Sequence, residues 1–312
     1  MRPRTVALGL GAVTVAGFVA ALRAERRWAS AEDELRPGDL ELPDGKPLVV
    51  TTDDGAELVG TVSGDGPLVV LPHCWTGSRT MWAPVAHRLL EADHQVVLYD
   101  QRAHGASTVG SDGLTIERLG DDLKAVLEAV DARDAVLAGH SMGGMTIQAL
   151  AARHPDVLAE RVKAVVLVAT AATGLGRGRG DATATRIIAS PALTRAMGGR
   201  AGHALVRGSV GANVRRSHLI VTRDLFLACP PEARAELLAE MQAMDLRDGL
   251  AGIGVPTTVM VGSRDRLTTP ARAADLVAAI PEAQLVTLDG AGHQLPLEAP
   301  DEIVAQILAL TD

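Results

Sequence analysis

Six short apolar runs recur along the chain, and longer segments with helical periodicity separate them. Unbroken runs of Val and Leu are typical of strands that are buried on both faces of a sheet. The spacing between the runs leaves room for crossover helices, as in βαβ units. The chain is therefore expected to form an α/β fold with a doubly wound, mostly parallel sheet. The runs are PLVVLP (67–72), QVVLYD (95–100), AVLAGH (135–140), AVVLVAT (164–170), TTVMVG (257–262) and AQLVTLD (283–289).

Two further apolar segments precede this series, LVVTT at 48–52 and AELVGTV at 56–62. The residues between them, Asp53-Asp54-Gly55, have the turn chemistry of a β-hairpin, in which Gly55 supplies a positive φ. We therefore expect the sheet to open with an antiparallel pair of strands.

The interval from about 171 to 255 is much longer than the other gaps between apolar runs. One crossover helix cannot use so many residues, and helical patterns such as PPEARAELLAEMQAM (230–244) predict a helical cap over the sheet. Residues 48–170 and 256–312 are then expected to form the core domain. The acidic segment 31–47 contains Pro and Gly and is expected to be a linker.

An uncharged run of 18 residues, Thr5 to Leu22, lies between arginines near the start of the chain. Such a run can nearly span the apolar core of a bilayer, so residues 1–30 are expected to form a single-pass membrane anchor. The arginines on the two sides do not decide its orientation. One alternative is a cleaved signal peptide with a small-residue site at 29–31, which would give a secreted protein. A buried soluble helix is another.

Charge and cysteine content exclude several classes of protein. The 312 residues carry a formal net charge of -8, whereas electrostatic binding of nucleic acid needs a basic surface. The two cysteines, Cys74 and Cys229, are too few for a disulfide scaffold, and neither belongs to a Cys/His cluster suited to a metal. We therefore expect no nucleic-acid partner and no metal.

A candidate nucleophile lies at the end of the run AVLAGH. The motif Gly139-His140-Ser141-Met142-Gly143 stands between a buried strand and a helical pattern, which is the context that a G-x-S-x-G nucleophile elbow requires. Glycines on both sides let the backbone turn sharply. Ser141 is therefore expected at the carboxyl end of the sheet.

A serine hydroxyl needs a general base to act as a nucleophile near neutral pH. His293 lies in the glycine-rich loop after the last apolar run, and a side chain there projects from the same edge of the sheet as Ser141. We therefore expect His293 to be the base. Three other histidines near this edge fit motif or packing positions better: His73, His104 and His140.

The base in turn needs an acceptor that fixes its tautomer and stabilises the imidazolium. Asp265 follows the buried run TTVMVG directly, and the order Ser, Asp, His is that of the α/β-hydrolase arrangement. Asp289 is the rival carboxylate, but it lies too near His293 along its own loop to be the expected partner.

Acyl transfer also needs N-H donors for the developing oxyanion. The run PLVVLP is followed by HCWTGS (73–78), which places backbone N-H groups beside the elbow. The backbone N-H groups of Trp75 and Met142 are the two expected donors, and no role is assigned to the Trp75 side chain.

The ordered series HCWTGS with a following MW, DQRAHGAS, GHSMGG, GSRDRLTTP and GAGHQLPLEAP resembles the motif series of α/β-hydrolase superfamily serine hydrolases. The resemblance covers about 48–310. It implies a central sheet of about eight strands, a helical cap inserted after the sixth strand, and no cofactor. Serine at the elbow, where epoxide hydrolases and haloalkane dehalogenases of this fold carry aspartate, makes those two chemistries poor candidates.

One departure from the family pattern concerns the oxyanion loop, where His73-Cys74 stands in place of the usual His-Gly. A thiol in apolar surroundings has a raised pKa and is unreactive, and a free cysteine also packs as a small hydrophobe. We therefore interpret Cys74 as a packing residue whose backbone does not require a positive φ. A functional thiol is the alternative.

These residues predict a serine esterase of the esterase/lipase-like type that cleaves a small acyl substrate through an acyl-enzyme intermediate. The same fold also supports carbon-carbon, amide and thioester hydrolysis and perhydrolysis, and fold analogy cannot separate them. Classes outside catalysis are a binding protein that retains the fold and a transporter part built on the N-terminal segment. No obligate protein partner is implied.

Overall fold

The computed structural model describes most of the chain from residue 35 onward. The expected anchor at 1–30 lies outside the described residues. In the part that the structure describes, no helix is both long and apolar enough to cross a membrane. The described residues are 35, 37–174, 182–199, 201–213 and 215–311.

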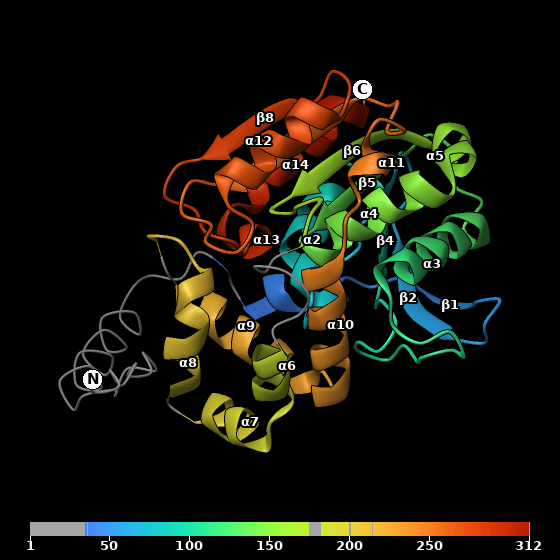
Figure 1. Ribbon diagram of the computed structural model, residues 1–312. Coiled ribbons are helices and arrows are strands. Elements are labelled where there is room, and N and C mark those ends of the chain that lie inside the picture. Colours follow the sequence, from blue (N-terminus) through green and yellow to red (C-terminus); the bar gives the residue numbers. More distant parts are fainter. Residues whose placement is uncertain (1–34, 36, 175–181, 200, 214, 312) are drawn as a thin grey trace, which may run out of the picture.

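One sheet contains eight strands: β1 (Lys46–Thr51), β2 (Glu57–Ser63), β3 (Leu68–Val70), β4 (Gln95–Tyr99), β5 (Ala135–His140), β6 (Val162–Val168), β7 (Thr257–Gly262) and β8 (Gln284–Leu288). Their order in the sheet is β1-β2-β4-β3-β5-β6-β7-β8 (Figure 1). Pairs β1/β2 and β2/β4 are antiparallel, and the other pairs are parallel. The prediction of a mostly parallel sheet of about eight strands is therefore confirmed.

The expected hairpin joins β1 to β2. Gly55 has φ +85°, a conformation that costs glycine little because it has no Cβ. Its N-H donates to the Thr52 carbonyl at 3.0 Å, and the Thr52 N-H donates to the Ala56 carbonyl at 2.9 Å. The positive φ expected from the sequence is thus present in this turn.

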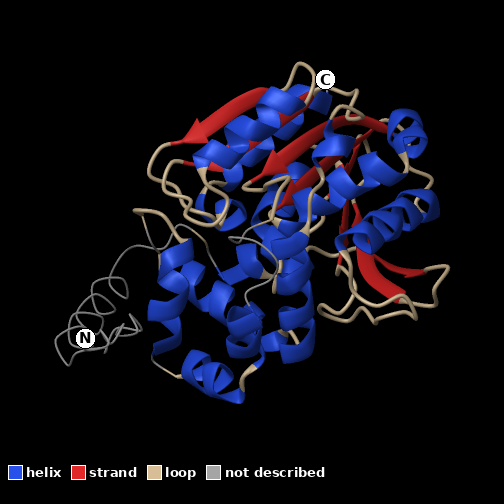
Figure 2. Cartoon of the chain, in the orientation of Figure 1, coloured by secondary structure: helices blue, strands red, loops and turns tan. Residues whose placement is uncertain are grey.

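Helices cover both faces of the sheet (Figure 2). Alternate residues of β3 show why the apolar runs are continuous. Val70 belongs to the core on the face covered by α3 and α4, whereas Val69 packs on the opposite face among side chains of α2 and α14. In the part of the chain that the structure describes, the helices outside the segment between β6 and β7 are α2 (Ala83–Glu91), α3 (Ile116–Ala129), α4 (Met142–Arg153), α5 (Pro155–Arg161), α12 (Pro270–Ala279), α13 (Leu295–Glu298) and α14 (Pro300–Thr311), with 3-10 turns η1 (Pro37–Leu40) and η2 (Arg79–Trp82).

The last strand departs from the prediction of strands buried on both faces. β8 pairs with β7 alone and forms one edge of the sheet. Leu285 on this strand is 43% exposed. An apolar run therefore indicated a strand correctly here, but the expectation that both of its faces are buried was wrong.

The segment between β6 and β7 contains the helices α6 (Ala182–Ala189), α7 (Pro191–Gly198), α8 (Ala201–Val206), α9 (Arg216–Ala228), α10 (Pro231–Ala243) and α11 (Arg247–Leu250), with a 3-10 turn η3 (Arg207–Ser209). Figure 1 shows α6 to α10 together on one side of the sheet, and we refer to α6 to α10 with η3 as the cap. Met197, Leu219 and Phe226 form part of a small separate core among them. By contrast, α11 contacts α4, and its Leu250 is buried in the main core.

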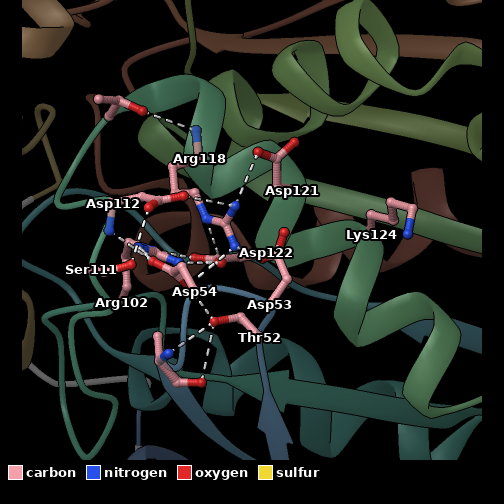
Figure 3. A network of polar contacts seen from close by, with 12 residues as sticks. Thr52, Asp53, Asp54, Arg102, Ser111, Asp112, Arg118, Asp121, Asp122 and Lys124 are labelled. Carbon is pink, nitrogen blue, oxygen red and sulfur yellow. Dashed lines mark hydrogen bonds and ion pairs between the residues drawn. The ribbon is translucent and has the colours of Figure 1, made fainter.

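A buried polar network ties the hairpin turn to the loop after β4 and to α3 (Figure 3). The Arg102 guanidinium is fully buried and donates from Nε and Nη2 to the two carboxylate oxygens of Asp122, each at 2.6 Å. Its Nη1 donates to Asp54 at 3.0 Å, and Arg118 binds the same Asp54 at 3.1 Å. These charge-assisted bonds hold the loop after β4 against the hairpin turn and α3.

Candidate active site

Ser141 lies at the junction of β5 and α4, in a strained conformation with φ 54° and ψ -113°. A positive φ at a residue other than glycine is costly and is characteristic of functional sites. The neighbouring glycines are needed for close approach: a Cβ on Gly143 would lie 2.0 Å from the Pro72 carbonyl oxygen, and one on Gly139 would lie 2.4 Å from the Gly143 carbonyl oxygen. The elbow thus leaves no room for side chains at these two positions.

The three predicted triad residues meet at this elbow. His293 Nε2 lies 3.1 Å from Ser141 Oγ, and His293 Nδ1 lies 2.8 Å from Asp265 Oδ2. Because Nδ1 faces a carboxylate, it carries the proton, which leaves Nε2 free to accept the serine proton. All three residues are at most 5% exposed. The geometry is therefore that of a nucleophile, a base and an orienting carboxylate.

Asp265 is held by four hydrogen bonds. Oδ1 accepts from the backbone N-H groups of Leu267 and Thr268, at 2.8 and 2.9 Å. Oδ2 accepts from Thr268 Oγ1 at 2.7 Å as well as from His293. Burial opposes ionisation, but the charge of His293 and these hydrogen bonds together lower the pKa of Asp265. The rival Asp289 is exposed and binds Ser263 instead.

The segment that follows β3 is fixed by two neutral histidines. The His73 Nε2 accepts from the Gln101 N-H at 2.9 Å, so its Nδ1 carries the proton and donates to the Cys74 carbonyl. His104 Nε2 accepts from the Thr76 N-H at 3.2 Å. Burial lowers the pKa of His73 to about 4 and that of His104 to about 3. Both histidines therefore hold the loop without carrying charge near neutral pH.

The two predicted oxyanion donors are free to serve a substrate. Met142 is the first residue of α4, so its N-H has no acceptor within the helix. Within the described part of the chain, no carbonyl accepts from the Trp75 N-H. The Trp75 side chain points to the cap, where Nε1 donates to the Arg234 carbonyl at 3.1 Å and the indole meets Phe226 edge-on at 6.4 Å.

His140, the variable residue of the elbow motif, has a role that the sequence did not reveal. Its Nε2 lies 2.8 Å from the His293 carbonyl oxygen and donates to it. Burial, the largest cause, lowers the pKa of His140 to about 3, so the ring is neutral near pH 7. The sequence predicted only a motif or packing position for His140, and it could not reveal this partner, which lies 153 residues away in the chain.

Ser141 and His293 open into a cavity of about 560 Å³ between the core and the cap. Most of its lining is apolar and comes from the cap, including Met197, Phe226 and Met241. Among the described residues, no group of three His, Cys, Asp or Glu side chains could hold a metal ion. The site therefore offers a polar, serine-based reaction centre beside an apolar binding space.

Comparison with known proteins places these features in one family. The family model described as "Alpha/beta hydrolase family" matches residues 69–306. A pimeloyl-(acyl-carrier protein) methyl ester esterase from Xanthomonas campestris pv. campestris (strain B100) is 31% identical over 247 residues, which are 78% of this chain and 94% of that protein.

The chain is also similar to a protein with a second activity and to a protein of known structure. A bifunctional esterase/perhydrolase from Acinetobacter calcoaceticus is 35% identical over 109 residues, which are 34% of this chain and 40% of that protein. The crystal structure of an enol-lactonase from Burkholderia xenovorans LB400 is similar with a TM-score of 0.70 and 29% identity, covering 84% of this chain and 99% of that one.

Proposed function

Because the chain belongs to the alpha/beta hydrolase family, we propose that it is a serine esterase that cleaves carboxylic esters through an acyl-enzyme intermediate. The observation that carries this proposal is the unbroken series of hydrogen bonds from Ser141 through His293 to Asp265. Carboxylic ester hydrolysis is the first choice because it needs only these residues and a pair of N-H donors.

In the proposed mechanism, Ser141 Oγ attacks the ester carbonyl carbon while His293 Nε2 takes the serine proton. The N-H groups of Trp75 and Met142 bind the oxyanion of the tetrahedral intermediate. His293 then gives its proton to the departing alcohol, which leaves an acyl group on Ser141. A water molecule, deprotonated by His293, attacks that acyl group, and His293 returns the proton to Ser141 Oγ as the acyl bond breaks and the acid is released. Asp265 stays ionised and keeps the imidazole in place.

The proposed substrate is a small molecule whose acyl or alcohol part fits the apolar cavity beside Ser141. Support comes from relatives that act on esters and lactones, since the methyl ester esterase spans most of this chain and the lactonase shares its fold at 29% identity. A lactone is a cyclic ester, so both names describe cleavage of an ester bond. Carbon-carbon, amide and thioester substrates are the alternatives.

Perhydrolysis is the second candidate function, favoured by the similarity to a bifunctional esterase/perhydrolase. In that reaction hydrogen peroxide replaces water in the second step and the released product is a peracid. The same acyl-enzyme serves both reactions. Measuring peracid release from an ester with and without hydrogen peroxide separates this candidate from simple hydrolysis.

The nucleophile is tested with a fluorophosphonate probe and with p-nitrophenyl esters of increasing acyl length. Wild type is expected to take up the probe and to hydrolyse the esters. Ser141→Ala should lose labelling and at least about 10³-fold in kcat, because the triad acts as one unit. Labelling of Ser141→Ala equal to that of wild type would reject this nucleophile.

A further inference from the structure

The loop that carries His293 is held from both sides of this residue by one carboxylate. Glu298, at the end of α13, accepts the Gly292 N-H on Oε2 at 2.9 Å and the Gln294 N-H on Oε1 at 2.9 Å. The Glu298 side chain therefore accepts hydrogen bonds from the residues immediately before and immediately after the proposed base. These two bonds restrict rotation of the backbone on both sides of His293. Hydrogen bonds behind a functional side chain orient it in this way.

The same carboxylate reaches into the cap. Glu298 Oε2 also accepts the N-H of Gly211 at 2.8 Å, and Gly211 lies between η3 and α9. Two backbone bonds strengthen this junction: the His293 N-H donates to the Ser209 carbonyl at 2.8 Å, and the Ala212 N-H donates to the Gly290 carbonyl at 2.7 Å. The cap and the histidine loop are thus joined by hydrogen bonds between their backbones.

Two glycines make this close approach possible. A Cβ on Gly211 would lie 2.2 Å from the Gly290 carbonyl oxygen and 2.5 Å from the Gly292 nitrogen. A Cβ on Gly292 would lie 2.4 Å from the Gly211 nitrogen. Since backbone atoms cannot yield as a flexible side chain can, any larger residue at Gly211 would push the cap segment away from the loop.

We propose that Glu298 is a positioning residue, which holds His293 at bonding distance from Ser141 by tying the histidine loop to the cap through Gly211. This inference rests on the proposed esterase function, because it assigns His293 the role of base. Glu298 does not line the cavity beside Ser141, so it would act through the backbone that carries His293 and not by touching the substrate.

The three hydrogen bonds to Glu298 require a side chain that accepts with both of its oxygens. Burial raises the pKa of Glu298, while the three backbone N-H groups and the charge of His293 oppose that rise. A carboxylate is the side chain that accepts three hydrogen bonds with two oxygens and donates none. Glutamine keeps one accepting oxygen but presents an NH2 group to a backbone N-H, and alanine removes every bond.

The test compares Glu298→Ala and Glu298→Gln with Glu302→Ala, which removes an exposed glutamate in the neighbouring α14. For p-nitrophenyl butyrate, Glu298→Ala should lose about 10- to 100-fold in kcat because a small displacement of the base is costly. KM should change less than kcat because Glu298 itself does not touch the substrate. Glu298→Gln should be intermediate, and Glu302→Ala should behave as wild type.

A second readout does not depend on activity. The proton between His293 Nδ1 and Asp265 should give a downfield proton NMR signal in wild type, which should weaken or broaden in Glu298→Ala and persist in Glu302→Ala. If Glu298→Ala does not fold, Gly211→Ala and Glu298→Gln carry the test. The losses in kcat from Gly211→Ala and Glu298→Gln should be less than additive when combined, because both changes disturb one contact.

The proposal is overturned if Glu298→Ala keeps wild-type kcat, if KM rises while kcat is retained, or if the Gly211→Ala and Glu298→Gln losses are simply additive. Failure of the esterase proposal would look different. In that case wild type would neither hydrolyse the esters nor label at Ser141, while the downfield signal would still report whether Glu298 positions His293.

Discussion

Cys74 is buried in the loop that precedes the proposed oxyanion donor. It packs with Met81 and Leu297, and burial raises the pKa of its thiol to about 12. Its backbone has no positive φ, whereas Thr76 two residues later has φ 57°. The loop therefore accepts cysteine where the family pattern has glycine, because Thr76 and not Cys74 adopts the left-handed conformation.

Replacement of this residue tests whether it only packs. Cys74→Ala is expected to change kcat/KM by less than about tenfold, or ~1.4 kcal/mol, because the neutral thiol contributes no charge to the reaction. Iodoacetamide should inactivate the native enzyme slowly, since the thiolate is the reactive form. Cys229→Ala is the matched control, because burial raises the pKa of that thiol to about 12 as well. Rapid inactivation that disappears in Cys74→Ala would show an exposed, functional thiol.

At the level of single residues, the sequence predicted those groups that stand in a local motif. Ser141 and Asp265 each follow a buried apolar run, and His293 stands in a glycine-rich loop. Thr268 and His140 were missed as partners of the triad, because their bonds to His293 join residues far apart in the chain. For Thr268 a local signal existed, since a hydroxyl three residues after an aspartate commonly binds its side chain or backbone.

Among the elements, the β1-β2 turn and α3 are joined by charged side chains (Figure 3). The Asp54 side chain is 3% exposed and contacts Arg102 and Arg118. The hydrogen bond from Arg102 is the largest cause that lowers the pKa of Asp54. Because this pKa is depressed, the contribution to stability is present above the unfolded-state pKa and is lost as pH falls through the folded one.

Asp54→Asn is therefore expected to lower the free energy of unfolding by about 3 kcal/mol at pH 7, as for a broken buried pair. The difference from wild type should begin to shrink below about pH 4, where unfolded aspartate protonates. Urea unfolding at several pH values measures both effects. Asp53→Asn is the control: its side chain is 81% exposed, and exposed pairs contribute little. An equal loss in both variants would argue against the buried network.

The positions of the strands were more predictable from the sequence than their burial and their packing partners. The apolar runs located the parallel strands and the turn chemistry located the β1-β2 hairpin, because both signals are local. The exposure of β8 was not predictable, since it depends on which strand ends at the edge of the sheet. Likewise, α11 lies within the segment expected to form the cap, yet it contacts α4. Neighbours along the chain do not reveal that packing.

For the whole molecule, the cap contributes to the proposed site and does not only cover it. It lines most of the cavity, binds the Trp75 side chain through the Arg234 carbonyl, and binds the histidine loop through Gly211 and Ser209. The proposed oxyanion loop and the loop of the proposed base are therefore both hydrogen-bonded to the cap. Movement of the cap would change substrate access and the position of the base together.

Residues 5–22 of the sequence are uncharged and can nearly span a bilayer. We propose that they anchor the protein in a membrane, with the described domain beginning close behind at Leu35, whose side chain is 7% exposed and packs with Met81 and Leu297. The full chain is expected to stay with membranes after high-salt and carbonate washing, whereas a peripheral protein would be released.

A chain lacking residues 1–30 is the matched control for this anchor, because the deletion removes the apolar run and keeps Leu35 in its packed position. It should be found in the supernatant and should retain the kcat/KM of the full chain, since the triad lies at least 100 residues further on. A mature N-terminus near Glu32 would instead establish cleavage at 29–31 and a secreted protein. Release of the uncleaved full chain by carbonate would reject the anchor, and the apolar run would then have to be buried against protein.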